Sequence, residues 1–179
     1  MKLLVPLFSV LLCFSCIPLR IAPSIKTDKV MVAKKFKRKL PKEHAFIFED
    51  PKDANEFYNY VNTKYERLHL DVESNVPFEI DGELFYFSFY EIEIQHKVLM
   101  LLPFLIDSKL NQGEDAPVLG EDYISRNGNR YLAITVSNAN MEDCLKPDNI
   151  HRNAVMNYLR HLRVEYLSTQ NYLDALFRK

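Results

Sequence analysis

Residues 78–94 read Phe-Glu-Ile-Asp-Gly-Glu-Leu-Phe-Tyr-Phe-Ser-Phe-Tyr-Glu-Ile-Glu-Ile, and this stretch decides the fold. Asp81-Gly82 is a two-residue hairpin signal, because both positions of such a turn need a positive φ. A short β-prone segment precedes the turn, and a long one follows it from Glu83 to Ile94, with side chains alternating between two faces. Both faces are apolar at first, so we expect both to be buried there, and the face that carries Phe85, Phe87 and Phe89 to become solvated where Glu91 and Glu93 begin.

Further elements are expected before this hairpin. His44 to Phe48 is a short β-prone run, and Asp50-Pro51 after it suits the N-cap and first position of a helix. That helix would present apolar residues spaced three and four apart, which are Ala54, Phe57, Tyr58, Val61, Tyr65 and Leu68.

The sequence after the hairpin predicts one more turn and a terminal helix. Lys97 to Asp107 could be a buried strand or the start of a helix, and we favour the strand. Pro103 within it forces an edge or a break. Asn127-Gly128 predicts a second tight hairpin. Asp148 or Asn149 can cap a helix with Val155, Tyr158, Leu159, Leu162 and Tyr166 on one face, and residues 170–177 could add a second, short helix.

This order of elements predicts an α+β fold. We expect a single domain with an antiparallel sheet of about five to six strands and an N-terminal and a C-terminal helix packed on it. A chain of 179 residues, 47% of them hydrophobic, has enough apolar material for one core. Folds of this class carry unrelated functions, so the fold alone assigns none.

Charge is segregated along the chain. Residues 16–42 hold nine Lys or Arg and one Asp, about +8, whereas residues 43–179 hold thirteen basic and twenty-three acidic residues, about −10. An acidic body argues against nucleic acid as a partner, because phosphate binding needs a clustered cationic face.

The first residues resemble an export signal. Lys2 followed by the apolar run Leu3 to Phe14 is typical of a signal peptide over residues 1–15, and the run is too short to span a membrane as a helix. Cys13-Phe14-Ser15-Cys16 resembles the lipobox of bacterial lipoproteins, which implies cleavage before Cys16 and lipid on that cysteine. The alternative is an ordinary secretory signal with an incidental cysteine. Ile17 is not acidic, so the resemblance favours the outer membrane.

The mature chain is expected to have two parts. Residues 16–42 would form a lipid-anchored basic tether and residues 43–179 the α+β domain. The candidates for membrane contact are the basic residues Lys34, Lys35, Lys37, Arg38 and Lys39. The alternatives are a solvated linker and a segment that folds back onto the acidic face of the domain.

No residue is assigned a catalytic role, and no metal site or cofactor is predicted, because the five histidines form no ligand pair and the acidic stretch Asp107 to Asp122 departs from the calcium-loop pattern. The weaker candidates are two. Glu91 and Glu93 share a strand face and could act as acid and base. Cys144 with His151 could form a thiolate pair, although Glu142 and Asp143 beside the cysteine disfavour its charged form.

The leading hypothesis is a non-enzymatic envelope lipoprotein, held on a membrane by lipid on Cys16, whose acidic domain binds another protein or helps to assemble a complex. An inhibitor or immunity-type lipoprotein belongs to this class. The alternative is a lipid-tethered hydrolase that uses the carboxylate pair or the cysteine. The ligand, the oligomeric state and the face of the membrane stay open.

Overall fold

The computed structural model describes residues 16–20, 22–100 and 124–173. It divides into a small unit within residues 1–23 and 94–129, and a large unit within residues 24–93 and 130–179. The expected signal peptide and the acidic stretch of residues 107–122 lie outside the described residues.

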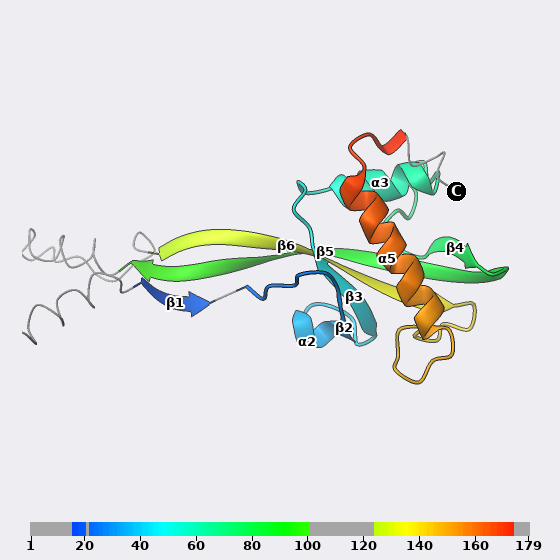
Figure 1. Cartoon of the computed structure of the whole chain (residues 1–179), viewed down its shortest axis with the longest axis horizontal. Helices are drawn as coiled ribbons and strands as arrows, with labels where there is room; N and C mark the ends of the chain where they lie inside the picture. Colours follow the sequence, from blue (N-terminus) through cyan, green and yellow to red (C-terminus); the bar gives the residue numbers. More distant parts are fainter. Residues whose placement is uncertain (1–15, 21, 101–123, 174–179) are drawn as a thin grey trace, which may run out of the picture. The chain divides into compact units, whose positions relative to one another are not determined.

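The large unit contains an antiparallel sheet with helices, which confirms the α+β class. Its strands lie in the order β4-β5-β6-β3-β2, and β5 and β6 also continue into the small unit (Figure 1). The bounds of the strands are β2 Lys29–Val32, β3 His44–Glu49, β4 Val76–Ile80, β5 Glu83–Met100 and β6 Ile124–Asn138. The β-prone run from His44 to Phe48 is therefore a strand, as expected.

The turn between β4 and β5 is the hairpin expected at Asp81-Gly82. Asp81 has a φ of 52° and Gly82 a φ of 83°, which are the left-handed values that a two-residue turn of this kind requires. Ile80 pairs with Glu83 directly beside the turn. Since Lys97 to Met100 belong to β5, the described part of the ambiguous stretch that starts at Lys97 is strand.

The prediction of a second hairpin at Asn127-Gly128 was wrong, because β6 runs through both residues as one strand. Among the described glycines only Gly82 has a positive φ, so the backbone at Gly128 does not turn. Strand β6 is hydrogen-bonded to β5 and, over Tyr131–Thr135, to β3, and such pairing favours an extended backbone. The pairing of β6 with distant strands therefore outweighs the local preference of Asn-Gly for a turn.

The first long helix starts later than expected. Helix α3 is Glu56–Lys64, preceded by Asn55 in the left-handed conformation, so the N-cap prediction for Asp50 was wrong. The carboxylate of Asp50 instead accepts hydrogen bonds from the backbone N–H of Lys52 and the hydroxyl of Tyr166. The local pattern predicted that Asp50 would cap a helix, but its carboxylate forms a turn with Lys52 and a tertiary contact with Tyr166.

Helix α5 is Arg152–Ser168 and begins after His151, so neither Asp148 nor Asn149 is its N-cap. The side chain of Asn149 accepts a hydrogen bond from the backbone N–H of His151 and thereby orders the entry into the helix. The expected apolar face is buried at Val155, Leu159, Leu162 and Tyr166. Of the second helix expected over residues 170–177, only residues 170–173 are described.

The main core lies between one face of the sheet and helices α3 and α5. Phe57 of α3 is at its centre, with its ring centroid 4.8 Å from Phe89 on β5 and 4.9 Å from Tyr166 on α5. The strand residues on this face include Phe46, Phe48, Phe85, Phe87, Leu132 and Ile134. This aromatic layer joins both helices to the sheet.

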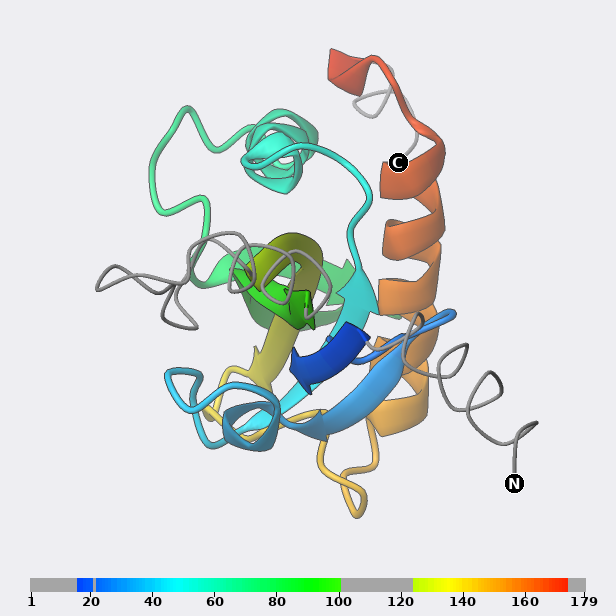
Figure 2. The same cartoon turned by 90° about the vertical axis from the view of Figure 1, so that its left-hand side faces the viewer.

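The other face of the sheet has a cover of its own over β3. Ala45 and Ile47 are fully buried, and the ring of Phe36 from the short helix α2, Ala33–Phe36, meets Tyr131 at 5.2 Å. Figure 2 shows α5 (orange) to one side of the sheet and α2 (light blue) to the other.

The structure therefore differs from the expected tether over residues 29–42. Strand β2 pairs with β3, and the backbone N–H of Ala33 donates to the carbonyl of Glu43. The apolar run Val30 to Ala33 explains the difference, because it supplies a strand and a buried residue between basic neighbours.

Several residues that are not glycine have left-handed backbones. Leu68 has a φ of 51° and Met141 a φ of 61°, and their side chains are 80% and 91% exposed. Such a φ is unfavourable for large side chains. The others are Asn55, Glu66, His69, Asp71, Asn75 and Asp81.

In the small unit, β1, Cys16–Arg20, pairs antiparallel with the end of β5, and Cys16 lies opposite Met100. Within the described ranges, no helix has the length and apolarity needed to cross a membrane.

Replacing Phe57 with Ala should lower the free energy of unfolding by about 3 to 5 kcal/mol, because it empties the centre of the aromatic layer. Urea titration of both proteins measures this difference. Leu68→Ala removes an exposed side chain and should change stability by less than about 0.5 kcal/mol. Equal losses for the two variants would contradict this picture of the core.

Candidate functional site

Glu91 has a structural contact. Its carboxylate accepts a hydrogen bond from the backbone N–H of Asn55 at 3.1 Å, just before α3. Partial burial raises the pKa of Glu91, the hydrogen bond from Asn55 opposes this, and the negative charge of Asp50 adds to it. The neighbouring residue Glu93 has an exposed carboxylate, and the backbone carbonyl of Glu93 accepts a hydrogen bond from the ammonium of Lys37. The two carboxylates share a face, as expected, but no described hollow encloses them.

Cys144 and His151 have different partners. The thiol of Cys144 is fully buried and donates to the carbonyl of Glu142, and burial raises its pKa to about 11. His151 Nδ1 lies 3.1 Å from Glu83, and its ring packs edge-on against Phe85. A buried, protonated thiol is a poor nucleophile.

A buried polar network was missed in the sequence. The Tyr166 hydroxyl donates to both oxygens of Asp50, at 2.9 and 3.1 Å. Lys52 Nζ donates to the carbonyls of Tyr166 and Thr169, at 2.7 and 2.5 Å, and lies over the Tyr166 ring. These contacts join residues more than a hundred positions apart, so no local spacing could have revealed them.

Burial sets the electrostatics of this network. Burial raises the pKa of Asp50 and outweighs the hydrogen bonds from Lys52 and Tyr166, which favour the charged carboxylate. It lowers the pKa of Lys52, against the charges of Glu56 and Asp50. Because the ammonium binds the carbonyls at the C-terminal end of α5, the network acts as an anchor between that helix and the segment before α3.

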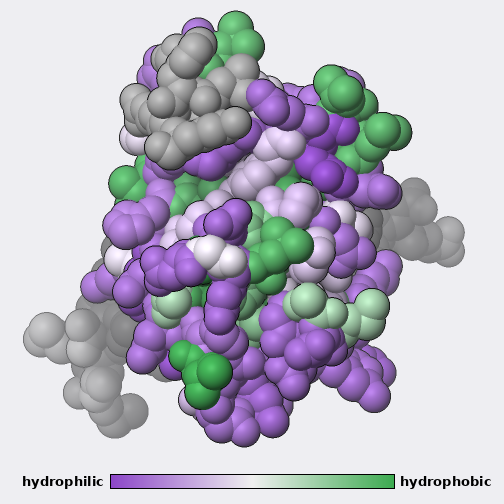
Figure 3. Space-filling view, turned by 90° about the vertical axis from the view of Figure 1, so that its right-hand side faces the viewer, coloured by the Kyte–Doolittle hydropathy of each residue, from purple (hydrophilic) through white to green (hydrophobic). Residues whose placement is uncertain are grey.

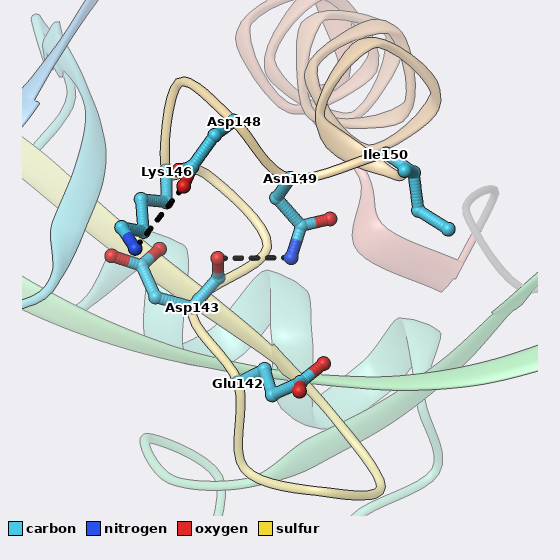
Figure 4. Close-up of a pocket in the computed structure, with 6 residues that line it drawn as sticks. All are labelled: Glu142, Asp143, Lys146, Asp148, Asn149 and Ile150. Carbon is cyan, nitrogen blue, oxygen red and sulfur yellow. Dashed lines mark hydrogen bonds and ion pairs between the residues drawn. The ribbon is translucent and has the colours of Figure 1, made fainter.

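The last residue of β6 and the loop from there to α5 make up residues 138–151, which line two of the described hollows. One hollow of about 470 Å³ is lined by Glu142, Asp143, Lys146, Asp148, Asn149 and Ile150 (Figure 4). Lys146 pairs with Asp148 at 3.3 Å, and the amide of Asn149 donates to the carbonyl of Asp143. Across the part of the chain that the structure describes, no group of three or more His, Cys, Asp or Glu side chains could hold a metal ion.

Large apolar side chains project from and beside this loop. Met141 is 91% exposed, Ile150 is 89% exposed, and Leu84 is about half exposed beside a second hollow of about 270 Å³. Figure 3, which faces the end of the large unit that carries the Asp81-Gly82 turn, shows hydrophobic residues as separate green patches among hydrophilic ones. We call the 138–151 loop together with Leu84 the loop surface.

A third hollow lies on the sheet face that α2 covers elsewhere. It measures about 250 Å³, and we call it the sheet groove. Its lining residues are Pro41, Glu43, Asn75, Tyr86, Ser88, Tyr90, Thr135, Val136, Ser137, Met141 and Asp143. The expectation that β5 is first buried on both faces was wrong here, because Tyr86, Ser88 and Tyr90 are half-buried and Leu84 is exposed.

The residues considered for membrane attachment are placed as follows. Cys16 is the first residue of β1. Among the basic candidates, Lys37 is half-buried and the others are exposed, namely Lys34, Lys35, Arg38 and Lys39.

Cys144 should react slowly with thiol reagents in the folded protein. A pKa of about 11 leaves about 100-fold less thiolate at pH 7.5 than an ordinary thiol pKa of 9.0 would, before steric protection by burial is counted. Mass spectrometry of the peptide that contains Cys144, after timed alkylation with and without urea, measures the ratio. Labelling at the same rate in both conditions would revive the nucleophile hypothesis.

No protein-family model matches the chain, and neither a curated protein nor a solved structure is similar to it at a significant level. A functional assignment therefore depends on the geometry of the described residues.

Proposed function

We propose that the protein is an exported lipoprotein of a bacterial envelope, anchored by lipid on Cys16, and that its α+β domain binds another protein without catalysing a reaction. The single observation that carries the binding role is the loop surface. There, exposed Ile150 lines one hollow, Leu84 lines a second, and Met141 is exposed on the same loop.

Exposed apolar side chains grouped around hollows are a feature of protein interfaces. Their loop is also held in shape before any partner arrives. The side chain of Asn138 accepts hydrogen bonds from the backbone N–H groups of Asn140 and Glu142, both at 3.0 Å, and Asp143 accepts one from Leu145. A surface that is already ordered loses less conformational entropy when it binds.

The hydrolase alternative has less support from the described contacts. The Glu91 carboxylate accepts a backbone hydrogen bond, and Cys144 is buried with a raised pKa. Neither residue lines any of the three hollows described above. Burial keeps Cys144 away from substrate. The carboxylates of Glu91 and Glu93 are exposed but line none of these hollows, whereas catalytic groups usually line a concave site.

The basic residues around α2 suit contact with an anionic membrane surface beside a lipid anchor. Lys34, Lys35, Arg38 and Lys39 are exposed, and each basic residue near such a surface contributes about 1 kcal/mol. Lys37 instead suits the alternative in which the basic segment folds back onto the domain, because its ammonium donates to the backbone carbonyl of Glu93. Membrane contact is therefore proposed for the four exposed residues.

Cys16→Ser should release the protein from membranes or leave an uncleaved precursor, because no acyl chain can then be attached. Fractionation of cells that produce each form, followed by mass spectrometry of the N-terminal peptide, measures this. Unmodified Cys16 in the mature wild-type protein would contradict the lipoprotein assignment. In the same fractionation, a Cys16→Ser protein whose residual membrane binding disappears at high salt would indicate contact by the basic residues.

The partner role predicts that charged substitutions on the loop surface abolish capture of a specific protein. The test variant is Leu84→Glu with Ile150→Glu, and the matched control is Val164→Glu, which also alters an exposed apolar residue, on α5. Crosslinked envelopes from each strain are analysed by affinity capture and mass spectrometry. A partner recovered at least about tenfold less with the test variant than with wild type and control supports the proposal.

Equal recovery of every captured protein across the three strains would sink the loop surface as a binding site. Thermal unfolding of the purified variants shows whether the fold is retained, and all three positions are exposed enough that it should be.

A further inference from the structure

We infer that the sheet groove is a binding site for a neutral saccharide chain. The inference concerns the face of β5 and β6 opposite the core. The groove shares Met141 and Asp143 with the loop surface, but the residues that carry the inference lie on β5 and β6 and in the 41–43 segment. Its basis is the combination of aromatic rings, hydroxyl groups and missing cations in one hollow of about 250 Å³.

The floor of the groove is rich in hydroxyl groups. They belong to Tyr86, Ser88, Tyr90, Thr135 and Ser137, and Asn75 adds an amide at the edge. A hydroxyl both donates and accepts hydrogen bonds, so such a floor matches a ligand that presents hydroxyls of its own. The Ser88 hydroxyl accepts a hydrogen bond from the backbone N–H of Asn75 at 3.1 Å. The backbone carbonyl of Ser88 accepts one from the Thr135 hydroxyl. These bonds hold the floor in place.

Tyr86 and Tyr90 supply aromatic surface at both ends of this floor. Both side chains are half-buried, and no hydrogen bond is found for either hydroxyl among the described residues. Four residues along a strand span about 13 Å. Because the apolar C–H faces of sugar rings pack well against aromatic rings, two tyrosines this far apart suit a chain of several rings better than a single small molecule.

The charges in the lining exclude anionic ligands. Among the residues that the structure describes, no Lys or Arg side chain lines the groove. Asp143 is already engaged, since its carboxylate accepts from the backbone N–H and the ring of His44 at 2.8 Å. Glu43 is exposed, and its carboxylate can accept hydrogen bonds from two neighbouring hydroxyls of a sugar.

A peptide fits the same groove less well. An extended peptide usually binds to the edge of a sheet, where backbone groups are free, whereas this groove lies on a face. Peptide side chains also need apolar pockets. Here Val136 is buried and offers little surface, so Pro41 and Met141 provide most of the apolar wall.

The test is saturation-transfer NMR with the full-length Cys16→Ser chain and four probes: chitotriose and maltotriose as neutral trisaccharides, trigalacturonic acid as an anionic one, and trilysine as a cationic peptide. We expect at least one neutral trisaccharide to bind, trigalacturonic acid to bind less, and trilysine not to bind.

Tyr86→Ala and Tyr90→Ala should each weaken trisaccharide binding by about tenfold or more, which corresponds to about 1.4 kcal/mol. Tyr58→Ala, a half-buried tyrosine of α3 that stacks on His69, is the matched control and should bind like wild type. Glu43→Gln keeps the shape of the groove and should weaken binding severalfold.

The inference is overturned if the wild-type protein binds neither neutral trisaccharide at millimolar concentration, or if it binds trilysine alone. It is also overturned if the two groove variants bind as tightly as the Tyr58→Ala control. Circular dichroism of each variant confirms that a loss of binding does not come from a loss of fold.

Discussion

Strand β3 imposes the constraint on which the rest of the structure depends, because its residues on both faces are apolar and fully buried. Phe46 and Phe48 face the core, where α3 and α5 cover them, and Ala45 and Ile47 face the opposite side. A sheet with two apolar faces must be covered twice. The second cover comes from the short helix α2 and its flanking residues, which is why a basic segment is held in the fold by β2 and by Ala33.

The limited extent of this second cover explains where the candidate sites lie. It shields β3 and Tyr131 but stops short of the first half of β5, so Tyr86, Ser88 and Tyr90 remain half-buried and the sheet groove forms beside them. On the first face the two helices are secured by a polar anchor as well as by packing, since Lys52 binds the carbonyls at the end of α5. The sheet is thus fully covered on the face that packs against α3 and α5 and only partly covered on the face that packs against α2.

Sequence patterns predicted the elements whose causes are local. The Asp81-Gly82 turn and the apolar face of α5 follow from neighbouring residues alone. The late start of α3 was unpredictable, because the partner of Asp50 is Tyr166, 116 positions away. The turn predicted at Asn127-Gly128 was wrong for a similar reason, because β6, which pairs with the distant strands β5 and β3, runs through both residues. The candidate site shared this limit, because the hollows combine β5, β6 and a distant loop, and only the alternation that puts Tyr86 and Tyr90 on one face was visible.

The left-handed backbones at Leu68 and Met141 mark two positions at which the sequence is not at its stability optimum. Each position combines a conformation that favours glycine or asparagine with a large side chain that is largely exposed. Replacement by glycine would relieve the backbone and remove apolar surface from water in one step. These two positions are therefore where a more stable and more soluble form of the chain can be sought with little change to the core.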